Sequence, residues 1–262
     1  MTYTLYQGDC LEVLPTLAAQ SVDAVICDPP YGTTACAWDS VIPLAPMWEQ
    51  LKRVIKPRGA IVLFAAQPFT SALVMSNAAW FRHTWVWRKP MGTNYLNANR
   101  DPMKNHEDVI VFANGYTTYN PQKRKSVAYR ATSGSVGDFI RDKTVGGWVT
   151  ENSGERFPLS VIDFDQAQNS LHPTQKPLDL MRYLVRTYTN PGDTVLDFTM
   201  GSGSTGVAAI MEGRNFIGIE LDARYYRIAE RRIANAQPPL FVADAPAVPE
   251  PEQAPMFAEV AA

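Results

Sequence analysis

Cysteine and histidine are scarce in this 262-residue chain, which holds three of each. Cys10, Cys27 and Cys36 form no C-x-x-C pair, and neither residue type has the spacing of metal ligands. We therefore expect no metal site. An odd number of scattered cysteines is typical of a reduced compartment, so the sequence predicts a cytoplasmic protein.

Long apolar runs and a strong net charge are also missing. No run of 18 apolar residues and no apolar leader occur, so we expect neither a membrane span nor secretion. The net charge is −2, but residues 237–262 hold four acids and no Lys or Arg, which leaves the rest at +2. So weak a charge argues against a DNA-binding module without a chemical activity.

The first feature that points to chemistry is a strand that ends at two prolines. Val22–Ile26 is an apolar β-type run that stops at Asp28-Pro29-Pro30-Tyr31, because proline has no N–H to continue a ladder. A residue before proline is held extended, so the Asp28 carboxylate has a fixed direction. With the Pro29 carbonyl it offers two acceptors beside an aromatic ring, which suits a planar ring bearing an amino group. An ordinary Pro-Pro turn is the alternative.

A glycine loop follows a second apolar strand. Thr194–Phe198 carries Asp197 and leads into the G-x-G-x-x-G sequence of 201–206, which opens a helix. The next strand, Asn215–Ile219, ends at Glu220-Leu221-Asp222, and an acid at that place binds ribose hydroxyls in nucleotide-binding folds. This spacing permits either NAD or S-adenosylmethionine.

Asp28-Pro29-Pro30-Tyr31 resembles the catalytic motif of the amino-methylating DNA methyltransferases. These enzymes transfer a methyl group from S-adenosylmethionine to adenine N6 or cytosine N4. The resemblance runs from Asp9 to about Ile233. The family's Asp-Pro-Phe-x-Gly-Ser-Gly motif reads Asp-Phe-Thr-Met-Gly-Ser-Gly at 197–203, without the proline and with the phenylalanine shifted. An NAD-dependent oxidoreductase stays the rival class, but it has no use for the Asp-Pro-Pro-Tyr motif.

The resemblance implies roles for two sets of residues. The catalytic set is Asp28, Pro29, Pro30 and Tyr31. The cofactor-binding set is Asp9, Cys10, Asp28, Thr174, Lys176, Asp197, Phe198, Gly201, Ser202, Gly203, Thr205, Glu220, Leu221 and Asp222. Within the second set, Asp9 matches the acid that bonds the cofactor's adenine, while Thr174 and Lys176 match the part that holds its methionine portion.

The choice of base follows from the same resemblance. Aspartate at the first motif position favours adenine, with cytosine N4 as the alternative. No cysteine has the setting of the nucleophile that methylation of cytosine carbon 5 requires, so we set that reaction aside. Methylation of RNA or of a protein amide stays open.

A long irregular segment, 116–159, separates the two motifs. It is basic and interspersed with aromatic residues, a composition that suits phosphate contacts and base stacking, although a solvated surface loop is the plain alternative. We expect it to recognise double-stranded DNA. The candidate DNA-binding residues are Trp38, Lys123, Arg124, Lys125, Arg130, Arg141 and Lys143.

Alternating strands and helices predict an α/β fold with a doubly wound, mostly parallel, seven-stranded Rossmann-like sheet, an antiparallel edge and an inserted recognition region. We divide the chain into a catalytic half (1–115), a target-recognition insert (116–160), a cofactor-binding half (161–236) and a disordered tail (237–262). This order resembles the permuted, β-type class of the family. We see no nuclease motif, so any restriction partner would be a separate chain; a homodimer stays open.

Overall fold

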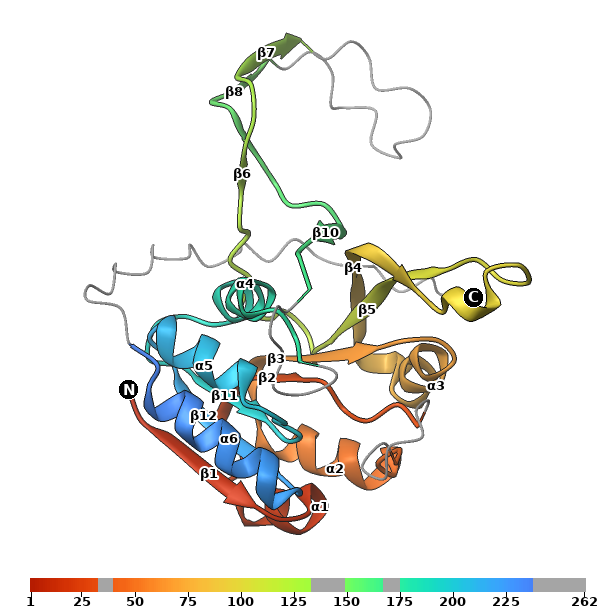
Figure 1. Ribbon diagram of the computed structural model, residues 1–262. Helices are drawn as coiled ribbons and strands as arrows, with labels where there is room; N and C mark the ends of the chain where they lie inside the picture. The colour runs from red at the N-terminus through yellow and green to blue at the C-terminus, as the bar shows by residue number, and fades with distance from the viewer. Residues whose placement is uncertain (33–39, 133–148, 167–174, 238–262) are drawn as a thin grey trace, which may run out of the picture.

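The computed structural model describes residues 1–32, 40–132, 149–166 and 175–237. Eight strands form one sheet in the order β1-β12-β11-β2-β3-β5-β4-β10 (Figure 1). Only β5 runs against its neighbours in this sheet, since every other pair is parallel. The strands are β1 (Tyr3–Gln7), β2 (Val22–Cys27), β3 (Ile55–Ala65), β4 (Phe81–Thr93), β5 (Lys104–Phe112), β10 (Val161–Asp163), β11 (Thr194–Asp197) and β12 (Asn215–Glu220).

Helices cover both faces of the sheet, because the central strands are apolar on both sides. In β2, Ala24 and Ile26 pack into one core with α4, α5 and α6, while Val25 and Cys27 pack into the other with α1, α2 and α3. The α-helices are α1 (Cys10–Val13), α2 (Leu44–Val54), α3 (Phe69–Ser76), α4 (Leu178–Tyr188), α5 (Ser204–Met211) and α6 (Ala223–Ala234). Short 3₁₀ turns are η1 (Leu14–Thr16), η2 (Ala78–Trp80) and η3 (Tyr95–Asn97).

The two motif-bearing strands are neighbours. β2 pairs in parallel with β11 through Val195 opposite Ala24 and Leu196 opposite Val25. Their carboxyl ends therefore meet at one edge, where the chain winds to β3 on one side and to β12 on the other. Asp28 and Asp197 are brought to this point from opposite ends of the chain.

The expected doubly wound, mostly parallel sheet is confirmed, with two differences in detail. The antiparallel strand, β5, lies inside the sheet between β3 and β4, and β10 adds an eighth strand beyond β4. Between β2 and β3 in the chain, α2 ends at Val54 and β3 begins at the next residue, Ile55. Pro57 lies in the register shift between the Val22–Ile55 and Ala24–Ala60 pairs, where its missing N–H breaks no ladder bond.

The inserted segment forms an arm instead of a wholly irregular loop. Its described part includes two antiparallel ribbons, and Figure 1 shows them rising from the body beside α4. They pair β6 (Arg124–Lys125) with β9 (Glu155–Arg156) and β7 (Tyr129–Thr132) with β8 (Val149–Asn152). The division of the chain at 115, 160 and 236 stays a proposal.

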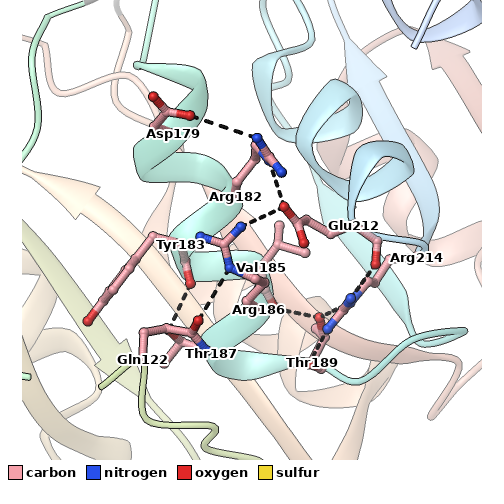
Figure 2. Close-up of polar contacts among 10 residues, drawn as sticks. All are labelled: Gln122, Asp179, Arg182, Tyr183, Val185, Arg186, Thr187, Thr189, Glu212 and Arg214. Atoms are coloured by element: carbon pink, nitrogen blue, oxygen red, sulfur yellow. Dashed lines mark hydrogen bonds and ion pairs between the residues drawn. The ribbon is translucent and has the colours of Figure 1, made fainter. Parts of the chain in front are cut away.

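A polar network holds the start of this arm against the body, and Figure 2 shows the part of it around Arg186 and Glu212. The Asn120 amide donates to the carbonyls of Arg186 and Thr189 at the end of α4, at 3.1 and 3.0 Å. Arg186 in turn bonds Gln122 of the arm and Glu212, which follows α5. The beginning of the arm is therefore attached to the end of α4 and, through Arg186, to the residue that follows α5.

No helix in the described part of the chain is long and apolar enough to cross a membrane.

Candidate active site

A cavity of about 720 Å³ opens at the carboxyl edge of the sheet where β2 and β11 meet. It is lined by the turn after β2, the loop between β11 and α5, the end of β12 and the start of α1. Its size lies within the range of roughly 300–1,000 Å³ that is usual for small-molecule sites. Its charged lining residues are Asp9, Asp28, Glu107, Lys176, Asp197, Glu220 and Asp222.

Both oxygens of the Asp28 carboxylate are engaged. The Tyr31 hydroxyl donates to Oδ1 at 2.5 Å, and the Lys176 ammonium donates to Oδ2 at 2.5 Å. The Tyr31 ring stacks on Phe69 with centroids 5.4 Å apart. The turn is also fixed through its backbone, since the Thr199 hydroxyl donates to the Asp28 carbonyl at 3.1 Å. The Asp-Pro-Pro-Tyr segment is thus held by contacts from three other parts of the fold.

Lys176 lies between two carboxylates. Its side chain is 8% exposed, and its ammonium lies 2.5 Å from Asp28 Oδ2 and 3.2 Å from Glu107 Oε2. The other Glu107 oxygen accepts a hydrogen bond from Lys89. Burial alone would lower the pKa of Lys176, but Asp28 and Glu107 raise it above its usual value. Lys176 is therefore a cation at neutral pH.

The two carboxyl groups of this cluster respond differently. Burial raises the pKa of Asp28 above its usual value and Glu107 adds to the rise, while Lys176 opposes it. Burial alone would also raise the pKa of Glu107, but Lys176 and Lys89 hold it below its usual value. Asp28 is thus the more basic of the pair.

Asp197 anchors the loop between β11 and α5. Its Oδ2 accepts from the Thr205 hydroxyl at 2.5 Å, and its Oδ1 accepts from the Thr199 amide at 3.1 Å. Burial raises the pKa of Asp197 to about 6, because these two hydrogen bonds offset only part of the desolvation. Gly201, whose φ is +52°, donates its N–H to Glu220 at 2.8 Å, so the loop folds back onto the end of β12.

The acids at the other strand ends also accept hydrogen bonds from nearby backbone amides. Asp9 accepts from the Leu11 amide and begins α1, and Asp222 accepts from two amides and begins α6. Glu220 accepts from the amides of Gly201 and Asp222, both at 2.8 Å. All three still line the cavity, so these backbone hydrogen bonds do not remove them from it.

Most of the residues that we expected at the site line this cavity. From the two predicted sets these are Asp9, Cys10, Asp28, Pro29, Pro30, Tyr31, Lys176, Asp197, Phe198, Gly201, Ser202, Thr205, Glu220, Leu221 and Asp222. Burial raises the pKa of the Cys10 thiol to about 12, so at neutral pH it is an uncharged wall residue.

Gly203 does not belong to the cavity lining. It lies at the start of α5 with φ +80°, and a Cβ there would stand 2.9 Å from the Cβ of Ala229 in α6. It therefore serves the packing of two helices. Thr174 lies outside the described residues.

None of the predicted DNA-binding residues that the structure describes lines the cavity. Lys123 pairs with Glu155 at 3.1 Å and Arg130 pairs with Glu151 at 3.4 Å, all on the exposed arm. Arg124 and Lys125 are exposed in β6. Trp38, Arg141 and Lys143 lie outside the described residues.

Sequence reasoning missed Glu107, Thr199 and Gln175, which also line the cavity. Thr199 stands where the family's motif has its phenylalanine, and the motif itself had been identified, so the Thr199 hydroxyl could have been predicted as part of the site. Glu107 carries no local signal, because it lies in β5, far along the chain from both motifs.

Two proteins of Escherichia coli (strain K12) are similar to this chain over most of its length. The putative methylase YubD is 28% identical over 243 residues, covering 88% of this chain and 90% of YubD. The DNA adenine methyltransferase YhdJ is 27% identical over 252 residues, covering 88% of this chain and 82% of YhdJ.

Solved structures share the fold. The M1.HpyAVI–SAM complex has a TM-score of 0.62 and 25% identity, covering 88% of this chain and 100% of that one. The cytosine-N4-specific PvuII DNA methyltransferase has a TM-score of 0.65 and 17% identity, covering 88% of this chain and 86% of that one. At this identity the similarity shows the fold alone. The family model described as DNA methylase, for N6 and N4 methyltransferases, matches residues 22–231, and this protein therefore belongs to that family of S-adenosylmethionine-dependent enzymes.

Proposed function

We propose that this protein is a site-specific DNA methyltransferase that methylates N6 of adenine in a base turned out of the duplex. The observation that carries the proposal is the adjacency of β2 and β11, which puts the Asp28 turn and the Asp197 loop in one cavity. One side of such a cavity can take an amino group while the other takes a methyl donor.

The charge of the cavity fits S-adenosylmethionine. Among the described residues, six carboxylic acids and one lysine line it, which favours a ligand with a sulfonium cation and ribose hydroxyls. The same lining would repel the pyrophosphate of NAD, so we set the oxidoreductase aside. Asp9, Asp197, Gly201 and Glu220 would hold the cofactor, which supplies an electrophilic methyl group on its sulfonium sulfur.

The catalytic turn prepares the acceptor nitrogen. An adenine amino group is a weak nucleophile because its lone pair is delocalised into the ring. The Asp28 carboxylate and the Pro29 carbonyl would accept its two N–H hydrogens and so favour a nitrogen whose lone pair points at the methyl carbon. When the nitrogen–carbon bond forms, the carbon–sulfur bond breaks with its electrons on sulfur, and Asp28 takes the proton that the nitrogen loses.

Tyr31 and the arm would hold the DNA. The Tyr31 ring stands next to Asp28 and would stack on the extruded base, whose extrusion costs a few kcal/mol. Arg124 and Lys125 are exposed on the arm and would bind phosphates, as would the basic residues outside the described part. An aspartate at the first motif position and the similarity to an adenine methyltransferase support adenine as the target.

Identification of the product tests the proposal. DNA incubated with the protein and S-adenosylmethionine is digested to nucleosides, which are separated and identified by mass and retention time. We expect N6-methyldeoxyadenosine. N4-methyldeoxycytidine would show that the target base is cytosine instead of adenine. Methylation of RNA or protein, with the DNA unmodified, would overturn the proposal.

A further inference from the structure

The cluster around Asp28 contains a carboxylate that the reaction, as described so far, does not use. Glu107 lies in β5 with its side chain 16% exposed, and it shares the Lys176 ammonium with Asp28. Its other oxygen is bound by Lys89 of β4. Charges therefore alternate along a buried chain, from Lys89 through Glu107 and Lys176 to Asp28.

A buried pair made of Asp28 and Lys176 alone would be a poor acceptor. An ammonium at 2.5 Å occupies a lone pair of the carboxylate and withdraws negative charge from it. A second carboxylate that binds the same ammonium weakens the attraction between the ammonium and the first carboxylate. In this protein Lys176 and Lys89 keep Glu107 ionised, so Glu107 can compete with Asp28 for the Lys176 ammonium.

We propose that Glu107 is a positioning residue for methyl transfer: by sharing Lys176 with Asp28, it leaves the Asp28 carboxylate able to accept one amino hydrogen of the substrate. The role presupposes the proposed function, since Asp28 needs this capacity only if an amino group is its partner. Glu107 acts through Lys176 and does not contact the reacting atoms.

Other ionisable groups face Asp28 and set the background against which Glu107 acts. The Tyr31 hydroxyl donates to it from the same turn. Asp197 of β11 and the Cys27 thiol of β2 lie close enough for the Asp28 charge to raise the pKa of each. Substitutions in β4 and β5 leave these three groups unchanged, so Glu107 and Lys89 can be varied separately from them.

Two substitutions of opposite charge make a sharp test. In Glu107→Gln, Asp28 is the one carboxylate left to pair with Lys176 in this cluster, so the pKa of Asp28 drops. In Lys89→Met the Glu107 anion binds Lys176 more strongly, so the pKa of Asp28 rises. We expect the acid limb of the single-turnover rate to move by about one pH unit, downward in the first variant and upward in the second.

The rate itself adds a second readout. At pH 7.5 we expect Glu107→Gln to lose about tenfold in rate, while the affinity for S-adenosylmethionine changes by less than about twofold. Glu49→Gln, a matched change on the exposed face of α2, should change neither quantity. The proposal would be overturned if the acid limb of the rate moved downward equally in Glu107→Gln and Lys89→Met, or did not move in either. A merely structural role of Glu107 predicts no shifts of opposite sign.

A measurement without turnover separates this proposal from the function on which it depends. The carboxyl ¹³C resonance of Asp28 in aspartate-labelled protein, assigned by its loss in Asp28→Asn, reports the pKa directly. A shift of that pKa in opposite directions without adenine methylation would contradict the function alone. Adenine methylation with an unmoved Asp28 pKa would contradict the role of Glu107 alone.

Discussion

Asp28 is the residue on which the proposed chemistry depends. Asp28→Ala removes the acceptor at the end of β2 but leaves the Asp197 loop and Glu220 in place. We expect the methylation rate to fall at least about a hundredfold, while the affinity for S-adenosylmethionine stays within about threefold. Single-turnover methylation and calorimetric titration measure the two quantities. Retained turnover would rule out the acceptor role.

Asp197 gives the fold a pH dependence of its own. Its pKa is raised to about 6 by burial, against about 3.9 in an unfolded chain. Between these values the folded protein holds a proton that the unfolded chain has released, so this group makes stability fall as pH rises from about 4 to 6. Above that window its ionised form disfavours folding by about 3 kcal/mol.

The Asp197→Asn variant isolates this contribution, because the amide cannot ionise. Urea unfolding of both proteins between pH 4 and 7 should show the wild type losing stability relative to the variant as pH rises. A difference that stays constant with pH, or one that grows in favour of the wild type, would show that Asp197 is not the group responsible.

The residues of the site could be predicted only where a local motif marks them. Asp28, Tyr31 and Gly201 stand in short sequence patterns, and the structure places all three in the cavity. Glu107 is brought there by the pairing of β5 with β3 and β4, a long-range property that no local pattern reports. Gly203 matched the glycine pattern, but its own backbone angle and its neighbour Ala229 give it a packing role.

At the scale of elements, the start of α5 depends on that glycine. Gly203→Ala would combine a strained φ of +80° with a Cβ 2.9 Å from Ala229, and should cost about 2–3 kcal/mol of unfolding free energy. Gly115→Ala is the control, since its φ is +94° but nothing lies within 4 Å of the new Cβ. Thermal unfolding should show a clearly larger loss for Gly203→Ala; equal losses would mean that the contact with α6 is unimportant.

Glu212, which follows α5, pairs with two arginines of α4, and one of these, Arg186, also bonds Gln122 of the arm. Its carboxylate accepts from Arg182 at 2.6 Å and from Arg186 at 2.7 Å, and its side chain is 11% exposed (Figure 2). Glu212→Gln should cost about 2 kcal/mol, because two half-buried guanidinium groups lose their counter-charge. Glu155→Gln on the arm removes an exposed pair with Lys123 and should cost less than about 0.5 kcal/mol. Urea unfolding compares them, and equal costs would contradict the anchoring role.

The buried apolar strands could be predicted from sequence, and the strands of two or three residues could not. Apolar runs identified β2 and β11, because these strands are buried on both faces. β10 has three residues and β6 and β9 have two each, too few to show any periodicity. The place of the reversed β5 inside the sheet follows from its pairing with β3 and β4 and not from its own residues.

At the scale of the whole molecule, charge decides between the two cofactors that a glycine loop allows. We expect S-adenosylmethionine at about 100 times its dissociation constant to stabilise the fold by about 2.7 kcal/mol, raising Tm by roughly 5–10 °C. NAD at the same concentration should leave Tm unchanged, because the acids among the described lining residues would repel its pyrophosphate. A rise of Tm with NAD alone would reverse the assignment.

The central claim is that one cavity brings the methyl donor to the Asp28 turn. A crystal structure of the protein with S-adenosylmethionine tests it most directly. We predict adenosine hydroxyls at Glu220 and the sulfonium methyl group facing the space beside Asp28 and Pro29. A donor bound elsewhere on the protein, or one whose methyl group points away from that turn, would contradict the account.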